Sequence, residues 1–403
     1  MTLNQLFQRF RRRLRGRLFL DAASGLPESA TSRHARRAAE RLWGNPSSPH
    51  AEGREAKLSL EASRRSVART LGAREGEVIF CSGGTEAVNL AVLGVARAMI
   101  AEGRPVTIIV AASAHPSARR AAEAARDEGA ALLEVPVDPR GRITPEAVAS
   151  SVGEGLSLIF VPRVAGETGA ISDTRAIGES ARRAAAAVGG RAALVVDAAQ
   201  AAVFENVSPS RLGADFLALD GAKFGGPKGS GCLVARGEVL PISYGGRQEG
   251  GRRAGTENVP AAAGFAAALI EAGRASEAFS NRASSSAEAA WAAICRAVPD
   301  AARNVAAKDS APHFLSVCLP GRDGAYACAV LDELGVSVSP SAACRAAAGE
   351  RLSAGYPNPA CAPSSVRLSF SGETGASRVS WLAEAFSRAA ALAVLPSPGP
   401  VVE

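Results

Sequence analysis

Between residues 77 and 220, short apolar runs alternate with helical segments, and this alternation constrains the fold more than any other feature of the sequence. The runs are four to seven residues long and several are bounded by Gly or Pro, which is typical of buried strands. Alanine-rich helical segments between them connect strands as parallel neighbours. The sequence therefore predicts an α/β fold with a mostly parallel, doubly wound sheet. Its strands are expected at 77–80, 106–112, 131–137, 156–162, 192–197 and 214–220.

The chain is expected to divide into two domains, because 403 residues exceed one typical core. After TENVP (256–260), two long alanine-rich helical segments precede HFLSVCLPG, VLDELGVSVSP and SSVRLSFSG. This mixed pattern predicts a smaller α+β domain. The expected parts are a basic arm (1–17), a large α/β domain (18–260), a small α+β domain (261–390) and a disordered tail (391–403).

Positive charge is concentrated at the N-terminus. Residues 1–20 contain six arginines and no acidic residue, so this segment holds six of the seven net positive charges. The nearly neutral remainder argues against a nucleic-acid partner, and without a run of about eighteen apolar residues no membrane partner is expected. The arm is a solvated helix, a transit peptide or a docking segment. A first strand predicted at LFLD (18–21) leaves little room for a removable presequence.

The seven cysteines are an odd number and include no Cys-x-x-Cys pair. That pattern argues against a disulfide framework and against a zinc site, so no metal is expected. Free thiols suit a reducing cytoplasm. An organellar matrix is the alternative location if the arginine-rich arm is a transit peptide.

The segment CSGGTEAVNL (81–90) combines the end of a strand, a pair of glycines and the start of a helix. Ligands of open α/β sheets gather at the carboxyl ends of the strands. Backbone N–H groups and the helix dipole make such a turn an anion site, and the Thr85 hydroxyl adds a donor. The alternative interpretation is an ordinary turn without a ligand.

The segment VVDAAQ (195–200) places Asp197 at the end of an apolar strand. Burying a carboxylate is costly unless a cation or a hydrogen-bond donor accompanies it. Gln200, three residues further on, could contact the same ligand. The alternative is that Asp197 caps the next helix.

The stretch ALDGAKFGGPKGSG (218–231) holds two of the four lysines of the chain. It fails as a phosphate-binding P-loop, because Pro227 stands where that motif requires lysine. Lys223 follows a predicted buried strand, and a desolvated lysine can form a Schiff base. Lys223 is therefore a candidate covalent anchor, whereas Lys228 is expected to have a structural or phosphate-neighbouring role.

Cys344 lies in SPSAACRAAAGE (339–350), a segment rich in small residues. A buried structural cysteine is the usual interpretation of such a residue. A catalytic thiol instead needs an accessible loop, which the Ser- and Ala-rich flanks would permit. Both interpretations stay open on this segment alone.

These motifs, in this order, resemble those of the cysteine desulfurases, pyridoxal-phosphate enzymes of fold type I in the class-V aminotransferase group. The resemblance covers about residues 18 to 380 and rests on LFLDAASGLP, GNPSSPHAEGREA, CSGGTEAVNLA, AHPS, VVDAAQ, GGPKGSG, YGGRQEGGRRAGTENVP and SSVRLSFS. It implies that the chain takes sulfur from L-cysteine, releases alanine and passes a persulfide sulfur to a protein acceptor, such as an iron–sulfur scaffold or a relay protein.

The resemblance also implies roles around the cofactor ring. Lys223 would hold pyridoxal phosphate covalently and shuttle protons, and Asp197 would pair with the pyridinium nitrogen. Gln200 would hydrogen-bond the phenolate oxygen of the ring. His115 would stack on the ring and assist proton transfer.

Further implied roles lie at the ends of the ligands. Gly84 and Thr85 would hold the cofactor phosphate, with Thr256 reaching across from the second subunit of a homodimer. Arg367 would clamp the substrate carboxylate through a bidentate contact. Cys344 would attack the sulfur of the substrate adduct.

The sequence departs from the family pattern around the lysine. The motif, normally Ser-x-His-Lys, is Asp220-Gly221-Ala222-Lys223 here, so Asp220 brings a carboxyl group to the phosphate side of the cofactor site. Like charges about 4 Å apart repel by roughly 4 kcal/mol at an effective dielectric constant of about 20. Either Asp220 turns away, or it is protonated and donates, or the phosphate sits differently. Elsewhere, Ala165-Gly166 replaces a pair of Asn residues and Ala22 replaces another.

These departures leave alternatives to an active desulfurase. The chain could be a desulfurase-like partner or regulatory protein with little catalysis. It could instead run a related pyridoxal-phosphate reaction of the selenocysteine lyase or aminotransferase type. All six main candidate residues are present together, which argues against complete loss of the active site. They are Lys223, Asp197, Gln200, His115, Cys344 and Arg367.

Overall fold

The computed structural model describes residues 16–340, 352–372, 374, 379 and 381–395. Contacts divide the chain into two compact units. The larger unit comprises Ser24–Gly166 and Ala170–Phe279. The smaller unit comprises Met1–Ala23, Glu167–Gly169 and Ser280–Glu403. Most of the predicted basic arm, the segment around Cys344 and most of the predicted tail lie outside the described residues.

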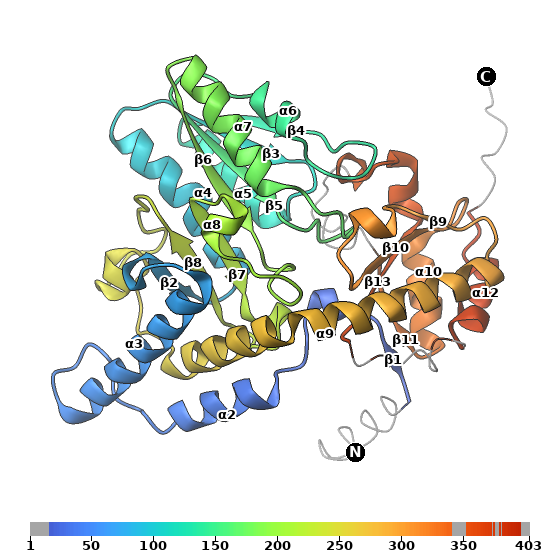
Figure 1. Cartoon of the computed structure of the whole chain (residues 1–403), viewed down its shortest axis with the longest axis horizontal. Coiled ribbons are helices and arrows are strands. Elements are labelled where there is room, and N and C mark those ends of the chain that lie inside the picture. Colours follow the sequence, from blue (N-terminus) through green and yellow to red (C-terminus); the bar gives the residue numbers. More distant parts are fainter. Residues whose placement is uncertain (1–15, 341–351, 373, 375–378, 380, 396–403) are drawn as a thin grey trace. The chain divides into compact units, whose positions relative to one another are not determined.

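A seven-stranded sheet forms the centre of the larger unit, in the order β2-β8-β7-β6-β5-β3-β4 (Figure 1). Six of these strands are parallel, and β8 runs antiparallel between β2 and β7. All seven residues of β5 are buried, as expected for a central parallel strand. The predicted mostly parallel α/β sheet is therefore confirmed. The strands are β2 (Val78–Cys81), β3 (Val106–Ala111), β4 (Ala131–Val135), β5 (Leu156–Pro162), β6 (Arg191–Asp197), β7 (Phe216–Asp220) and β8 (Gly231–Ala235).

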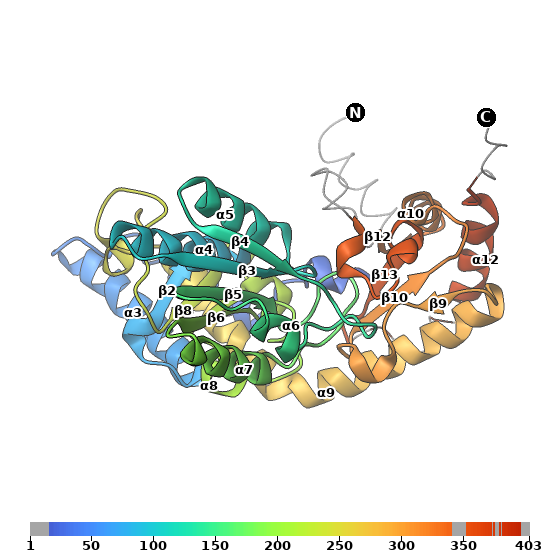
Figure 2. The same ribbon diagram turned by 90° about the horizontal axis from the view of Figure 1, so that it is seen from above.

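Helices of the larger unit lie on both faces of its sheet. The helices wholly within this unit are α2 (Ala30–Ala39), α3 (Ala51–Leu71), α4 (Gly84–Ala101), α5 (Pro116–Asp127), α6 (Pro145–Ala149), α7 (Thr174–Ala187) and α8 (Pro209–Leu212). Figure 2 shows α4 and α5 on one face of the sheet and α7 and α8 on the other. Both faces of the parallel sheet are thus covered, as a doubly wound fold requires.

The helix α4 is the core helix of this unit. Its apolar residues occur all around the helix, and ten of its residues are buried. Among the described residues it is the one helix with the length and hydropathy of a membrane span, but 67% of it is buried inside the protein. A buried core helix of this kind has the same composition as a membrane span.

The smaller unit contains a four-stranded antiparallel sheet in the order β12-β13-β10-β9. The helices α10 and α12 contact each other, and α10 also packs against β13. Helices beside antiparallel strands confirm the predicted α+β character of this part. The elements are β9 (Ala302–Arg303), β10 (Phe314–Cys318), α10 (Gly324–Glu333), β12 (Ser339–Pro340), β13 (Ser365–Ser369) and α12 (Leu382–Leu392).

The strand predicted at LFLD exists but does not belong to the larger unit. It is β1 (Leu18–Phe19), which pairs in parallel with β11 (Val336–Ser337) in the smaller unit. Apolar patterning identifies a strand, but pairing across more than 300 residues of chain leaves no local signal. The expected start of the large domain at residue 18 is therefore wrong.

The two helical segments predicted after TENVP are one helix, α9 (Val259–Ala297), of 39 residues. Alanine has the highest helix propensity, so the segment tolerates Gly264 and Gly273 without a break. The division between the units falls inside this helix, after Phe279, and not after residue 260 as the sequence suggests.

The expectation that the chain lacks disulfides is also wrong, because Cys318 and Cys361 are paired. Cys318 ends β10, and Cys361 lies in the short helical segment η7 (Pro359–Ser364) that precedes β13. Their Cα atoms are 5.4 Å apart, within the usual range for a disulfide. Sequence spacing could not reveal this pair, since 43 residues separate the two cysteines.

Close backbone packing in the larger unit depends on Gly231, the first residue of β8. Gly231 pairs with Cys81 of β2 on one side and with Asp220 of β7 on the other. A Cβ atom at this position would lie 2.6 Å from the carbonyl carbon of Gly83. Only a residue without a side chain therefore lets the backbone before α4 lie over the start of β8.

Gly231→Ala is expected to destabilise the larger unit by about 1–3 kcal/mol, because backbone atoms cannot move aside for the added methyl group as a flexible side chain could. Gly273→Ala is the matched control. Gly273 is exposed in α9, and a Cβ there meets no atom within 4 Å, so the control should gain up to about 1 kcal/mol. Denaturant unfolding of both variants measures the difference. Equal stability of the two would contradict the packing argument.

Candidate active site

Most of the predicted site residues lie along the carboxyl edge of the seven-stranded sheet. Because six strands are parallel, their carboxyl ends meet at one edge, where ligands of such sheets gather. The charges of His115, Asp220 and Lys223 all act on Asp197, so these four groups share one region. At or shortly after the ends of β2, β3, β6 and β7 lie Gly84, Thr85, His115, Asp197, Gln200, Asp220 and Lys223.

Asp197 is the last residue of β6. Its Oδ1 accepts a hydrogen bond from the Ala199 N–H at 2.9 Å, which caps a turn at residues 199–204. Withdrawal from water raises the pKa of the Asp197 carboxyl, and the charge of Asp220 raises it further. The Ala199 hydrogen bond and the charges of His115 and Lys223 oppose that rise. The carboxyl group is therefore sensitive to any cation placed beside it.

Lys223 lies in the short helical turn η3 (Gly221–Lys223) directly after β7. Its Nζ donates a hydrogen bond to the Ser24 carbonyl oxygen at 2.9 Å. The neighbouring Leu26 N–H donates to the Ala222 carbonyl at 2.8 Å. These two hydrogen bonds attach the segment at residues 24–26 to the turn that contains Lys223. No sequence pattern identifies Ser24 in this role, because a contact through the backbone carbonyl does not depend on residue type.

His115 is the N-cap of α5, and its side chain is exposed. The ring Nδ1 lies 3.2 Å from the Ser117 nitrogen and 2.8 Å from the Ser117 Oγ. Because Nδ1 accepts from the Ser117 N–H, the ring proton of neutral His115 resides on Nε2. The Ser117 contacts thereby fix both the tautomer and the orientation of the ring.

Asp220 does not turn away from the expected phosphate position. Its Oδ2 accepts a hydrogen bond from the Gly84 N–H at 3.3 Å, and its Oδ1 accepts from the Ala222 N–H at 3.0 Å. Both contacts use the carboxyl oxygens as acceptors. The side chain therefore occupies the N-terminus of α4, where the sequence predicted an anion.

Thr256 lies apart from these residues in the loop before α9, and it is exposed. It lines a hollow of about 250 Å³ together with Ser82, Ser230 and Gly231. The hollow adjoins the turn that leads into α4. Thr256 thus lines, in its own chain, the same hollow as Ser82.

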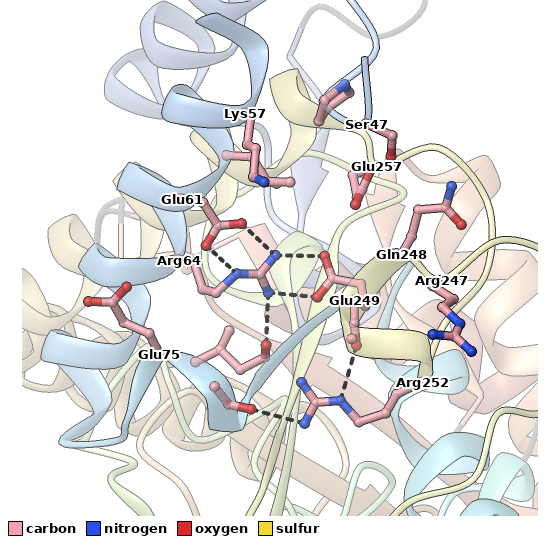
Figure 3. Close-up of a pocket in the computed structure, with 15 residues that line it drawn as sticks. Ser47, Lys57, Glu61, Arg64, Glu75, Arg247, Gln248, Glu249, Arg252 and Glu257 are labelled. Carbon is pink, nitrogen blue, oxygen red and sulfur yellow. Dashed lines mark hydrogen bonds and ion pairs between the residues drawn. The ribbon is translucent and has the colours of Figure 1, made fainter. Parts of the chain in front are cut away.

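A second hollow, of about 410 Å³, lies beside a buried ion pair between Arg64 and Glu249 (Figure 3). The Glu249 carboxylate accepts from Arg64 Nη1 at 2.6 Å and Nη2 at 2.9 Å, and from the Phe80 N–H at 3.0 Å. Burial alone would lower the pKa of the Arg64 guanidinium, but the hydrogen bonds and charge of Glu249 raise it above its ordinary value. The pair therefore joins α3, β2 and the loop at 247–252 as a structural element.

The remaining predicted residues belong to the smaller unit. Arg367 lies in β13, and its Nη2 contacts the Asp21 Oδ1 at 2.9 Å. Both side chains are largely buried, at 12% and 19% exposure, so Asp21 holds the guanidinium in place. No local sequence pattern links Asp21 to Arg367, because 346 residues separate them. Cys344 lies outside the described residues.

A family model described as "Aminotransferase class-V" matches residues 18–382. "Putative cysteine desulfurase IscS 1" of Bacillus subtilis (strain 168) is 34% identical over 307 residues, which cover 75% of this chain and 79% of the relative. "Cysteine desulfurase" of Cereibacter sphaeroides is 32% identical over 338 residues, covering 81% of this chain and 84% of the relative. The chain belongs to the cysteine desulfurase family of class-V aminotransferases.

Solved structures agree with this family. A "NIFS-like protein" superimposes with a TM-score of 0.83 at 25% identity, covering 93% of this chain and 100% of that one. The apo cysteine desulfurase of Thermococcus onnurineus NA1 has a TM-score of 0.77 over 92% of this chain and 94% of that one, and at 22% identity it supports the fold alone. Alignments to some relatives are shorter: the chain spans 55% of the relative from Frankia and 54% of that from Methanosarcina thermophila.

Glu249→Ala is expected to destabilise this family member by about 3–5 kcal/mol, because it leaves the buried Arg64 guanidinium without its main partner. Glu179→Ala is the matched control. It removes an exposed ion pair with Arg175 one helical turn away in α7, which contributes at most about 1 kcal/mol. Denaturant unfolding of both variants measures the difference. A similar loss in the two would refute a structural role for the buried pair.

Proposed function

We propose that the chain is an active cysteine desulfurase that converts L-cysteine to alanine and an enzyme persulfide, with pyridoxal phosphate as its cofactor. The observation that supports the proposal most strongly is the grouping of Lys223, Asp197 and His115 at one edge of the sheet. These groups supply a nucleophilic amine, an anion for a ring nitrogen and an imidazole for proton transfer. Membership of a pyridoxal-phosphate family supports the same reaction class.

The residues at the sheet edge fit the ring side of pyridoxal phosphate. When bound, this cofactor supplies an electron sink that eases bond breaking at the substrate α-carbon. The Lys223 amine would hold the cofactor covalently. The Asp197 carboxylate would form an ion pair with the pyridinium, and this positive charge would oppose the rise in the pKa of Asp197 that its burial causes. Gln200 follows Asp197 closely enough to contact the same ring.

Proton movement is assigned to Lys223 and His115. The Ser24 carbonyl accepts a hydrogen bond from the Lys223 Nζ, which orients the amine. As a neutral amine, Lys223 would take and return a proton at the substrate α-carbon. His115 presents Nε2 as its remaining proton-carrying nitrogen, since Nδ1 accepts from Ser117.

The smaller unit would supply substrate binding and sulfur transfer. Arg367, held by Asp21, would bind the carboxylate of L-cysteine. The thiolate of Cys344 would attack the substrate sulfur and form the S–S bond of the persulfide. The electron pair of the broken carbon–sulfur bond goes to the substrate β-carbon, which takes up a proton to complete alanine.

The working enzyme is proposed to be a homodimer in which Thr256 of a second copy adds a hydroxyl donor to the phosphate site. Gly84 and Thr85 would supply the helix N-terminus. A protein acceptor would then collect the persulfide sulfur. The exposed position of Thr256, in the loop before α9, is compatible with a contribution to another copy.

One contact favours a second candidate, a desulfurase-like protein of low activity. Asp220 accepts a hydrogen bond from the Gly84 N–H, and this N–H group belongs to the proposed phosphate site. Weak cofactor retention would leave a larger share of the chains without catalysis. Turnover of L-cysteine with and without added pyridoxal phosphate separates the candidates, because the low-activity protein turns over slowly until the cofactor is saturating, whereas the active desulfurase turns over as isolated.

Lys223→Ala is expected to remove the visible absorption of lysine-bound cofactor and to lower alanine formation by at least about 100-fold. Lys228→Ala is the matched control, because Lys228 is exposed five residues further along the same loop. It should retain colour and turnover. The measurements are absorbance after reconstitution and alanine released from L-cysteine. If Lys223→Ala retains the colour and Lys228→Ala loses it, then Lys228 and not Lys223 binds the cofactor covalently.

Cys344→Ala is expected to keep the cofactor absorption but to lose the enzyme persulfide, because the attacking thiolate is gone. Cys295→Ala, which removes a partly exposed thiol in α9, serves as the control and should form persulfide normally. Mass spectrometry of the protein after one turnover with L-cysteine detects the added sulfur. Undiminished persulfide in Cys344→Ala would exclude this residue as the acceptor.

A further inference from the structure

We propose that the Asp220 carboxylate holds the anion position at the N-terminus of α4 and competes there with the cofactor phosphate. Asp220 would then set how strongly the chain binds a phosphate group. The inference rests on the proposed function for the identity of the ligand. Its structural basis is the pair of contacts from Asp220, to Gly84 at 3.3 Å and to Ala222 at 3.0 Å.

The helix α4 has no side-chain cap of its own, because its N-cap residue is Gly83. The first N–H groups of a helix lack partners within it, and the helix dipole adds positive potential there. Asp220, 136 residues away in sequence from Gly84, fills this gap with a carboxylate oxygen. A Cβ atom at Gly84 would lie 3.1 Å from the Asp220 Cβ and 3.3 Å from its Oδ2. The carboxylate and the helix entry are thus in direct contact.

Charges around this position give an arriving phosphate little help. Glu86 in the first turn of α4 is paired with Arg253 at 2.9 Å, so the guanidinium is already engaged. Asp197 adds a second carboxyl group, whose pKa the charge of Asp220 raises. The positive charges of Lys223 and His115 act on the Asp197 carboxyl group. The proposed function assigns Lys223 to the cofactor ring and not to the phosphate.

A phosphate oxygen and the Asp220 Oδ2 are therefore alternatives for the same Gly84 N–H. Both together would place like charges in contact at a partly dehydrated site. Binding of the cofactor then requires the carboxylate to give up the Gly84 N–H, and this cost reduces the affinity gained through the phosphate. Recognition would rest mainly on the ring and on the bond to Lys223.

The comparison of pyridoxal phosphate with pyridoxal tests this inference directly. The dissociation constant of pyridoxal divided by that of pyridoxal phosphate reports what the phosphate adds to the affinity. Both constants are measured by absorbance with the full chain. In Asp220→Asn this ratio should be about tenfold or more higher than in the wild type. The repulsion between two like charges in contact corresponds to more than a tenfold change in affinity, and the substitution removes one of these charges. Asparagine keeps the shape and an oxygen acceptor for the Ala222 N–H. Asp127→Asn, an exposed residue at the end of α5, makes the same charge change elsewhere.

A second measurement does not depend on the cofactor. Inorganic phosphate, compared with chloride at equal ionic strength, should raise the thermal unfolding midpoint of cofactor-free Asp220→Asn. It should raise those of the wild type and Asp127→Asn less, because a ligand stabilises in proportion to its affinity for the folded state.

The outcomes separate the inference from the proposed function. An unchanged or lower ratio in Asp220→Asn, with cofactor still bound, overturns the inference and leaves the desulfurase proposal standing. If no variant binds either aldehyde, the desulfurase proposal fails, and the phosphate measurement decides on Asp220 alone. Equal phosphate stabilisation of the wild type and Asp220→Asn then overturns the inference.

Discussion

One close approach governs the centre of the larger unit: the backbone before α4 lies over the first residue of β8. Gly231 permits it, because a side chain there would collide with the backbone of Gly83. Gly231 also pairs with Cys81 and with Asp220, so it sets the distance between the end of β2 and the end of β7. The contact between Asp220 and Gly84 bridges these two strand ends and depends on that spacing.

The sequence predicted this sheet edge well because its signals are local. Apolar runs of four to seven residues fixed the strands, and the parallel connections then required their carboxyl ends to meet. Lys223 and Asp197 stand at the ends of adjacent strands β7 and β6, so their proximity followed from strand order. The Gly-Gly turn before α4 was similarly legible from its position between a strand and a helix.

Other features depend on chain segments far apart in sequence, and no local pattern encodes them. The pairing of β1 with β11 and the Cys318–Cys361 disulfide both arise from tertiary packing. The position of Asp220 is a third case. The sequence showed that its charge was unexpected, but it left open whether Asp220 turns away, is protonated and donates, or displaces the phosphate. In the structure, hydrogen bonds from the Gly84 and Ala222 N–H groups hold the carboxylate at the start of α4.

A carboxylate at this position changes how stability is shared between the cofactor-free and cofactor-bound chain. An anion at a helix N-terminus contributes up to about 2 kcal/mol in a partly buried setting. With Asp220 in place, the empty chain already has much of that stabilisation. A neutral residue would leave the helix end open when empty, and the phosphate would then supply the missing anion on binding. Under the proposed function, the replacement at this position would favour a protein that stays folded without its cofactor, at the expense of a tighter hold on the phosphate.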